Sequence, residues 1–122
     1  MPDEVRRAAE GAVPGFAIAE AVLGDEDGRS CYEIQGKSGD GTVEIIVTPE
    51  GEVLAIEREV PVASVPAAVL SAAVARIPGF APSKAELIRK KGAVTYELKG
   101  KAGGKVYEVV VAEAGEVLEV ED

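Results

Sequence analysis

The chain has 122 residues, enough for one compact domain, and 47% of them are hydrophobic, which is ordinary for a protein with a folded core. Its formal net charge of −9 argues against nucleic acid or an anionic membrane surface as partner, because both attract basic proteins. No apolar run approaches the roughly 18 residues that a membrane-spanning helix needs. We therefore expect a folded protein that neither binds nucleic acid nor inserts into a membrane.

The sequence repeats itself at an offset of 64 residues. The first 58 residues align without a gap with the last 58, and 23 of these pairs are identical, including Pro14–Ala17 with Pro78–Ala81. A repeat of this length predicts one structural unit duplicated in tandem. We place the units at residues 1–61 and 62–122. We expect them to fold together as one compact domain, because each alone is too small to bury its sheet well.

The first unit is predicted to begin with a helix. Pro2 and the acids after it suit a first helical turn, apolar residues recur at helical spacing from Val5, and Pro14-Gly15 ends the helix. Turn residues then separate four strand candidates. These are Ile18–Leu23, which is weak, and Ser30–Lys37, Thr42–Thr48 and Val53–Glu59.

The second unit repeats this order. Ser64 is a candidate cap for the second helix, which Pro78-Gly79 ends. The strand candidates are Lys84–Ile88, Val94–Lys101, Val106–Ala112 and Val117–Glu121. The charge is uneven, because residues 1–61 hold 14 acids and 5 bases whereas residues 62–122 hold 8 of each.

Alternation along the strands predicts two layers. Pairing across the second hairpin places Tyr32 opposite Val47 and Ile34 opposite Ile45, and the second unit repeats the pattern. Every member of these pairs has an apolar body, so this face should meet the helices. The predicted fold class is α+β, with two tandem α-β-β-β-β repeats forming a mainly antiparallel sheet and two helices packed on one face.

The opposite face of the sheet is expected to be open and to carry glutamates beside β-branched residues. Exposed apolar area of this kind marks an interaction surface, or it simply reflects strand propensity. A bulge in the turn at residues 49–51 would shift the last strand by one position. The candidate partner-binding residues are Glu33, Glu44, Ile46, Val53, Glu97, Glu108, Val110 and Val117.

Several of these features together resemble the PepSY domain: a helix ending in Pro-Gly, a Tyr-Glu-apolar strand, the Tyr-Glu-Val-Val strand at residues 107–110, and the closing Gly-Glu-Val-Leu-Glu-Val at 115–120. They are similar in particular to tandem, secreted PepSY-like proteins whose fold is like that of the beta-lactamase inhibitor protein. The matching stretches are Ala9–Phe16 with Tyr32–Glu57, and Ala73–Phe80 with Tyr96–Glu121.

The resemblance implies a non-enzymatic, extracytoplasmic protein. PepSY domains occur in peptidase propeptides and are thought to inhibit or chaperone peptidases, so the implied partner is a protein, with a peptidase as one case. The family usually carries a signal peptide. We therefore expect that one was trimmed from this periplasmic or secreted chain, with a cytoplasmic location as the alternative.

Residue types that usually carry catalysis are scarce. Histidine is absent, which removes the commonest general base and zinc ligand, and Cys31 has no partner base. No glycine-rich loop leads from a strand into a helix, as a phosphate site would require. We predict no catalytic residue, no cofactor and no dedicated metal site. The glutamate pairs 44/57 and 108/121 could hold a proton or a cation, or extend into water.

The favoured hypothesis is a non-enzymatic extracytoplasmic binding module, a peptidase inhibitor or propeptide-like protein that uses its open sheet face and is a monomer or weak homodimer. Three alternatives are a self-associating structural protein, an idealised or engineered repeat scaffold without a natural ligand, and a surface that binds divalent cations weakly through carboxylates. Opposite charges at the equivalent hairpin tips Asp25–Asp27 and Arg89–Lys91 raise the first alternative.

Overall fold

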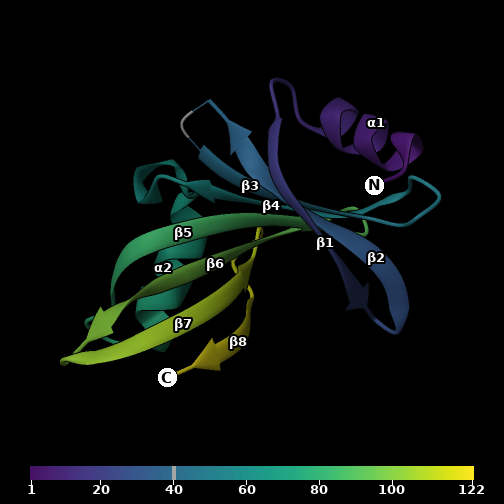
Figure 1. Ribbon diagram of the computed structural model, residues 1–122. Coiled ribbons are helices and arrows are strands. Elements are labelled where there is room, and N and C mark those ends of the chain that lie inside the picture. The colour runs from purple at the N-terminus through teal and green to yellow at the C-terminus, as the bar shows by residue number, and fades with distance from the viewer. Residues whose placement is uncertain (40) are drawn as a thin grey trace. The chain divides into compact units, whose positions relative to one another are not determined.

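The computed structural model describes residues 1–39 and 41–122. The chain divides into two compact units, residues 1–58 and 59–122, and each unit sets one α-helix against antiparallel strands (Figure 1). The fold is α+β, as the sequence predicts. The first unit contains α1 (Asp3–Ala12), β1 (Ala17–Glu26), β2 (Arg29–Ser38), β3 (Gly41–Val47) and most of β4 (Val53–Val60). The second contains a 3₁₀ turn (Val62–Ser64), α2 (Ala67–Arg76), β5 (Ala81–Lys90), β6 (Ala93–Ala102), β7 (Lys105–Ala112) and β8 (Val117–Glu121).

The two units share one pairing register at the 64-residue offset. Ala17 pairs with Lys37 in the first unit, and Ala81 pairs with Lys101 in the second. Both first hairpins carry a register shift near their start, at residues 18–20 and 82–84. The predicted pairs Tyr32–Val47 and Ile34–Ile45 are confirmed. The duplication in sequence is therefore a duplication of strand geometry.

Tight turns make the first strand of each unit longer than predicted. Asp27 and Gly28 have φ angles of 53° and 81°, and Lys91 and Gly92 have 52° and 76°. Two successive residues at positive φ are typical of the type I′ turn, whose twist matches that of the strands it joins. The hairpin pairing therefore continues to the turn, and β1 and β5 end at residues 26 and 90.

One face of each sheet buries the helix. In the first unit Val5 and Ala9 of α1 are fully buried with Ile34 and Ile45 of the sheet. In the second unit the equivalent core residues are Val69, Ala73, Leu98 and Val109. The predicted apolar stripes of both helices are confirmed. Small residues on the helix bring its axis close to the sheet, so branched side chains from the strands fill the layer between them.

The prediction that Val53 points away from the helix is wrong. The three-residue turn before it places Gly51 at φ 93°, and the Thr48 backbone N–H donates to the Glu52 carbonyl oxygen at 2.8 Å. This turn shifts the pairing by one residue, which reverses the face of each side chain until the shift is cancelled. Val53 consequently pairs with Val47 and packs into the α1 core.

A bulge in β4 cancels that shift. Leu54 is the extra residue, so the next pair is Ile46 with Ala55, and Glu44 then lies opposite Glu57 as predicted. The second unit repeats both irregularities. Val117 pairs with Val111 and packs into the α2 core, which makes the predicted outward placement of Val117 wrong for the same reason.

The expected cap of the second helix is also wrong. Helix α2 follows Pro66, and Ser64 lies in the preceding 3₁₀ turn. The Ser64 hydroxyl donates to the Pro61 carbonyl oxygen at 2.7 Å, so it serves that turn. Proline at the helix start loses nothing by lacking an N–H, because the first N–H groups of a helix have no partner within it.

We predict that Gly100→Ala destabilises the protein by about 2–3 kcal/mol, because an added Cβ would overlap the Ala81 backbone beside the first bulge. Gly11→Ala in α1 is the matched control: nothing lies within 4 Å of its added Cβ, so it should stabilise by about 0.5–1 kcal/mol. Urea unfolding of both variants measures the difference. Equal stability of the two would contradict the packing described for the bulge.

Candidate protein-binding surface

The face of the second unit's sheet that points away from α2, here called the outer face, carries two cross-strand rows of charged residues. Pairing places Glu86 opposite Glu97, Glu97 opposite Val110, and Val110 opposite Glu119. We call these four residues the acidic row. The adjacent mixed row consists of Lys84, Lys99, Glu108 and Glu121. Side chains in such rows stand about 4.5–5.5 Å apart at Cβ, so neighbours interact directly.

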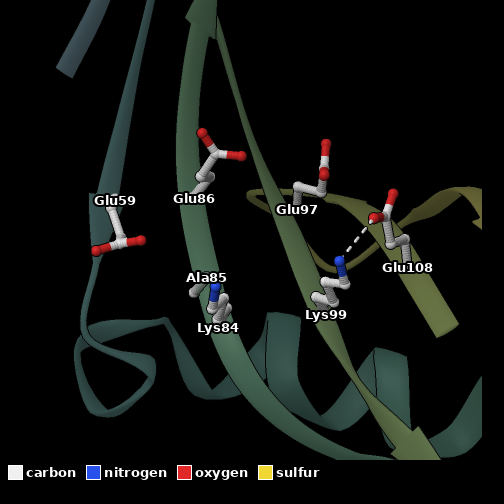
Figure 2. A pocket seen from close by; sticks show the side chains of 7 residues that line it. All are labelled: Glu59, Lys84, Ala85, Glu86, Glu97, Lys99 and Glu108. Carbon is white, nitrogen blue, oxygen red and sulfur yellow. Dashed lines mark ion pairs between the residues drawn. The ribbon is translucent and has the colours of Figure 1, made fainter. Parts of the chain in front are cut away.

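Glu86 and Glu97 of the acidic row, with Lys84, Lys99 and Glu108 of the mixed row, line a hollow of about 320 Å³. Figure 2 shows the carboxylates of Glu86 and Glu97 rising from neighbouring strands on the same side of the sheet. Lys99 Nζ lies 3.7 Å from Glu108 Oε1, so these two side chains form an ion pair across neighbouring strands. The lining residues are Glu59, Lys84, Ala85, Glu86, Glu97, Lys99 and Glu108.

The electrostatics of the hollow are dominated by carboxylates. The pKa of Glu97 is raised above its ordinary value, first by burial and then by the negative charges of Glu86, Glu108, Glu121 and Glu119. Like charges placed directly opposite each other across strands destabilise a sheet. Direct contact between the carboxylates of Glu86 and Glu97 is therefore unfavourable.

The equivalent outer face of the first unit differs in character. The positions that match the acidic row hold Val22, Glu33, Ile46 and Ala55. Ile46 is only 5% exposed, so its predicted exposure on an open apolar patch is wrong. It packs with Ala55 and Cys31 on the neighbouring strands, because apolar cross-strand neighbours exclude water from one another.

The thiol of Cys31 belongs to this small cluster. The residue is free and buried, and burial raises its pKa, with the charge of Glu33 adding to the effect. A thiol held in its neutral form is a poor nucleophile. Cys31 therefore acts as an apolar side chain of the sheet.

The structure brings together only some of the residues predicted from sequence. Glu97, Glu108 and Val110 lie together on the outer face of the second unit, and each is partly exposed. Glu33 and Glu44 lie partly exposed on the outer face of the first unit, where Gln35 Nε2 donates to Glu44 Oε1 at 3.4 Å.

Sequence reasoning missed the remaining members of the acidic row. Glu86 and Glu119 align with Val22 and Ala55 at the 64-residue offset. That substitution of carboxylates for apolar residues was the available signal, but it gains meaning only when the register places both residues in the same cross-strand row as Glu97.

Within residues 1–39 and 41–122, no group of three or more acidic, cysteine or histidine side chains has an arrangement that could hold a metal ion. Over the same described residues, neither helix is long and apolar enough to cross a membrane.

We predict that Glu97→Gln stabilises the protein at pH 7 by about 0.2–1 kcal/mol, the range for relief of a like-charge cross-strand contact. Because the folded-state pKa is raised, the Glu97 proton stabilises the fold in acid, and that stability is lost as pH rises through the folded pKa. The advantage of the variant should therefore vanish near pH 3. Urea unfolding at both pH values measures it, with Glu113→Gln in an exposed turn as control. A variant less stable than the wild type at pH 7 would contradict this electrostatic description.

Comparison with known proteins places this geometry in a family context. Residues 2–57 match PepSY, the peptidase propeptide and YPEB domain. No curated protein is similar enough in sequence to match the chain. Among solved structures, a DUF2874 family protein from Bacteroides uniformis is 13% identical with a TM-score of 0.78, over 99% of this chain and 88% of that one.

Two further structures share the fold. A Bacteroides eggerthii protein with a provisional periplasmic description is 18% identical, with a TM-score of 0.77 over 98% of this chain and 87% of that one. A BLIP-like protein from Bacteroides fragilis is 14% identical, with a TM-score of 0.74 over 99% and 85%. These identities are too low to transfer a function. The first unit therefore resembles a PepSY domain over residues 2–57, and the chain as a whole shares the fold of the BLIP-like protein.

Proposed function

We propose that the protein is a non-enzymatic, extracytoplasmic binding module that engages a protein partner through the outer face of its second unit. The observation that carries this proposal is the hollow bordered by the acidic row, on a sheet face opposite the helix. A protein can keep like charges in cross-strand contact at some loss of stability when a partner uses them.

The internal repeat supports a functional reading of this row. The same strand positions in the first unit are occupied by Val22 and Ala55, so this sheet geometry accepts apolar residues there. Glu86 and Glu119 therefore serve something other than the shared strand geometry. Recognition of a partner is the role that exposed charged side chains on a rigid sheet fulfil most directly.

The chemistry of the chain supports binding in preference to catalysis. Histidine is absent from the sequence, and the single cysteine is buried with a raised pKa. The match of residues 2–57 to a peptidase propeptide domain makes a peptidase the first partner to test, with inhibition or assisted folding as the outcome. Location outside the cytoplasm is supported by the description of one structural neighbour as periplasmic.

A photo-crosslinking experiment tests this proposal. Val110→benzoylphenylalanine places a crosslinker at the centre of the acidic row, whereas Val74→benzoylphenylalanine places it on the exposed face of α2, where Val74 is 43% exposed. In cells that naturally contain the protein, we expect discrete adducts from position 110 and none of these from position 74. Purified wild-type protein added in excess should compete with the adducts.

Identical adduct patterns from the two positions, or no adduct from position 110, would contradict use of the outer face. If the adducts appear, mass spectrometry identifies the partner. Assay of any captured peptidase with and without the purified protein then decides whether binding inhibits it.

A further inference from the structure

The duplicated chain contains the same apolar surface twice, covered in the second unit and open in the first. On the helix side of β5, Ala85 is 1% exposed and Leu87 packs against the α2 core. The matching residues on β1 are Ala21 and Leu23, which are both exposed, Leu23 to 65%. Leu23 pairs with Tyr32 of the α1 core, so it lies on the helix side too, and Ala21 shares that face because it is two residues away.

The segment that precedes α2 covers this surface in the second unit. Val60 and Val62 pack against the core cluster that contains Ala85, and the 3₁₀ turn that begins at Val62 contacts β5. Pro61 is extended, with φ −62° and ψ 140°, which directs the valines on either side of it to the same side. We call residues 60–62 the cover segment. At the 64-residue offset it matches positions before Met1, so the described residues of the first unit include no counterpart.

The charge beside the surface is reversed between the two units. Glu59 directly precedes the cover segment, and it borders the same hollow as Lys84 of β5 (Figure 2). The residue of β1 that matches Lys84 is Glu20, which is exposed, and Asp25 likewise matches Arg89. An acidic residue before the apolar pair therefore suits β5, whereas a basic residue at that position suits β1.

The backbone of β1 adds a second means of attachment. It is the end strand of its unit's sheet and pairs with β2. An end strand presents N–H and C=O groups with which an added strand can pair. Side chains of an added strand alternate between the two sides of the sheet. An apolar pair separated by one residue can thus cover Ala21 and Leu23 while the residue before it faces Glu20.

We propose that an extended segment of a partner protein docks along β1, with two β-branched residues covering Ala21 and Leu23 and a preceding basic residue facing Glu20. The first unit then holds a basic counterpart of the cover segment, as the second unit holds residues 60–62. This surface is separate from the outer face of the second unit. The inference goes beyond the proposed function and does not depend on it.

Three blocked octapeptides derived from residues 57–64 are suitable probes. They are the native Glu-Arg-Glu-Val-Pro-Val-Ala-Ser, the basic Lys-Arg-Lys-Val-Pro-Val-Ala-Ser, and Lys-Arg-Lys-Ser-Pro-Ser-Ala-Ser, which lacks the apolar pair. Each is titrated into the full-length ¹⁵N-labelled protein and followed by NMR. We expect the basic peptide to shift the backbone amides of Ala21, Leu23 and Tyr32 in a saturable manner. The serine peptide should bind about ten-fold more weakly, and the native peptide several-fold more weakly at about 0.05 M salt.

Two pairs of variants locate the binding surface, and the amide spectrum of each variant reports whether it keeps the fold. Leu23→Ser should weaken the basic peptide about ten-fold, whereas Val106→Ser on β7, where Val106 is 43% exposed, should bind as the wild type does. Glu20→Lys gives β1 the residue found at the matching position of β5, and it should lower the preference for the basic over the native peptide several-fold. Glu113→Lys, at an exposed turn, makes the same change of charge and should leave that preference unchanged.

The inference is wrong if the basic peptide gives no saturable shifts at β1, if the serine peptide binds equally well, or if Leu23→Ser and Val106→Ser bind alike. Shifts at Ala21 and Leu23 that follow protein concentration without peptide would also overturn it, because they would assign the surface to a second copy of the chain. Position 110 lies in the second unit. The crosslinking experiment therefore tests the proposed function separately, and either proposal can fail while the other stands.

Discussion

The pairing register of the strands is the constraint on which the rest of the structure depends. In a strand the side chains alternate between faces, so a shift of one residue exchanges the buried set for the exposed set. Here the register is fixed by glycines at positive φ in the tight turns and by one bulge in the hairpin between the last two strands of each unit. Each of these turns and bulges recurs 64 residues later, so both units bury equivalent faces of their strands.

The turn and the bulge of that hairpin shift the pairing in opposite directions, and the outer face depends on both. The turn at Gly51 shifts the pairing and directs Val53 into the helix-facing core, while the extra residue Leu54 restores the register for Ala55 and Glu57. In the second unit the same turn geometry packs Val117 against the α2 core and places Glu119 opposite Val110 and Glu121 opposite Glu108. The proposed binding surface is thus a consequence of turn geometry several residues away.

Much of this fold could be predicted from the sequence because the signals are local. Helix ends at Pro-Gly, strand alternation and the 64-residue repeat depend on neighbouring residues and on self-comparison. The faces of Val53 and Val117 could not be predicted, since a bulge is decided by backbone geometry that many sequences tolerate.

The burial of Ile46 could not be predicted either, because it depends on which side chains three different strands bring together. The candidate site was predicted in part for the same reason. Glu97, Glu108 and Val110 follow from alternation within single hairpins, whereas Glu86 and Glu119 join them only through pairing across four strands.

Duplication also allows structural requirements to be separated from functional ones within a single chain. Positions that keep their residue type in both units, such as Gly36 and Gly100, lie where an added Cβ would overlap the backbone of the first strand. Positions that differ, such as Val22 and Glu86, lie on the outer face. Contact with the helix therefore does not restrict the residue type at these positions. Glu86 and Glu119 of the acidic row belong to the second class, which supports the proposal that the row serves recognition.

That assignment is tested most directly by the free energy of unfolding of the double variant Glu86→Val, Glu119→Ala at pH 7, measured by urea titration against the wild type. If the glutamates of the row serve recognition, the variant should be as stable as the wild type or more stable by about 0.2–1 kcal/mol, because like charges have been separated. A loss of more than about 1 kcal/mol would contradict the account, since it would mean that the acidic row is a requirement of the fold.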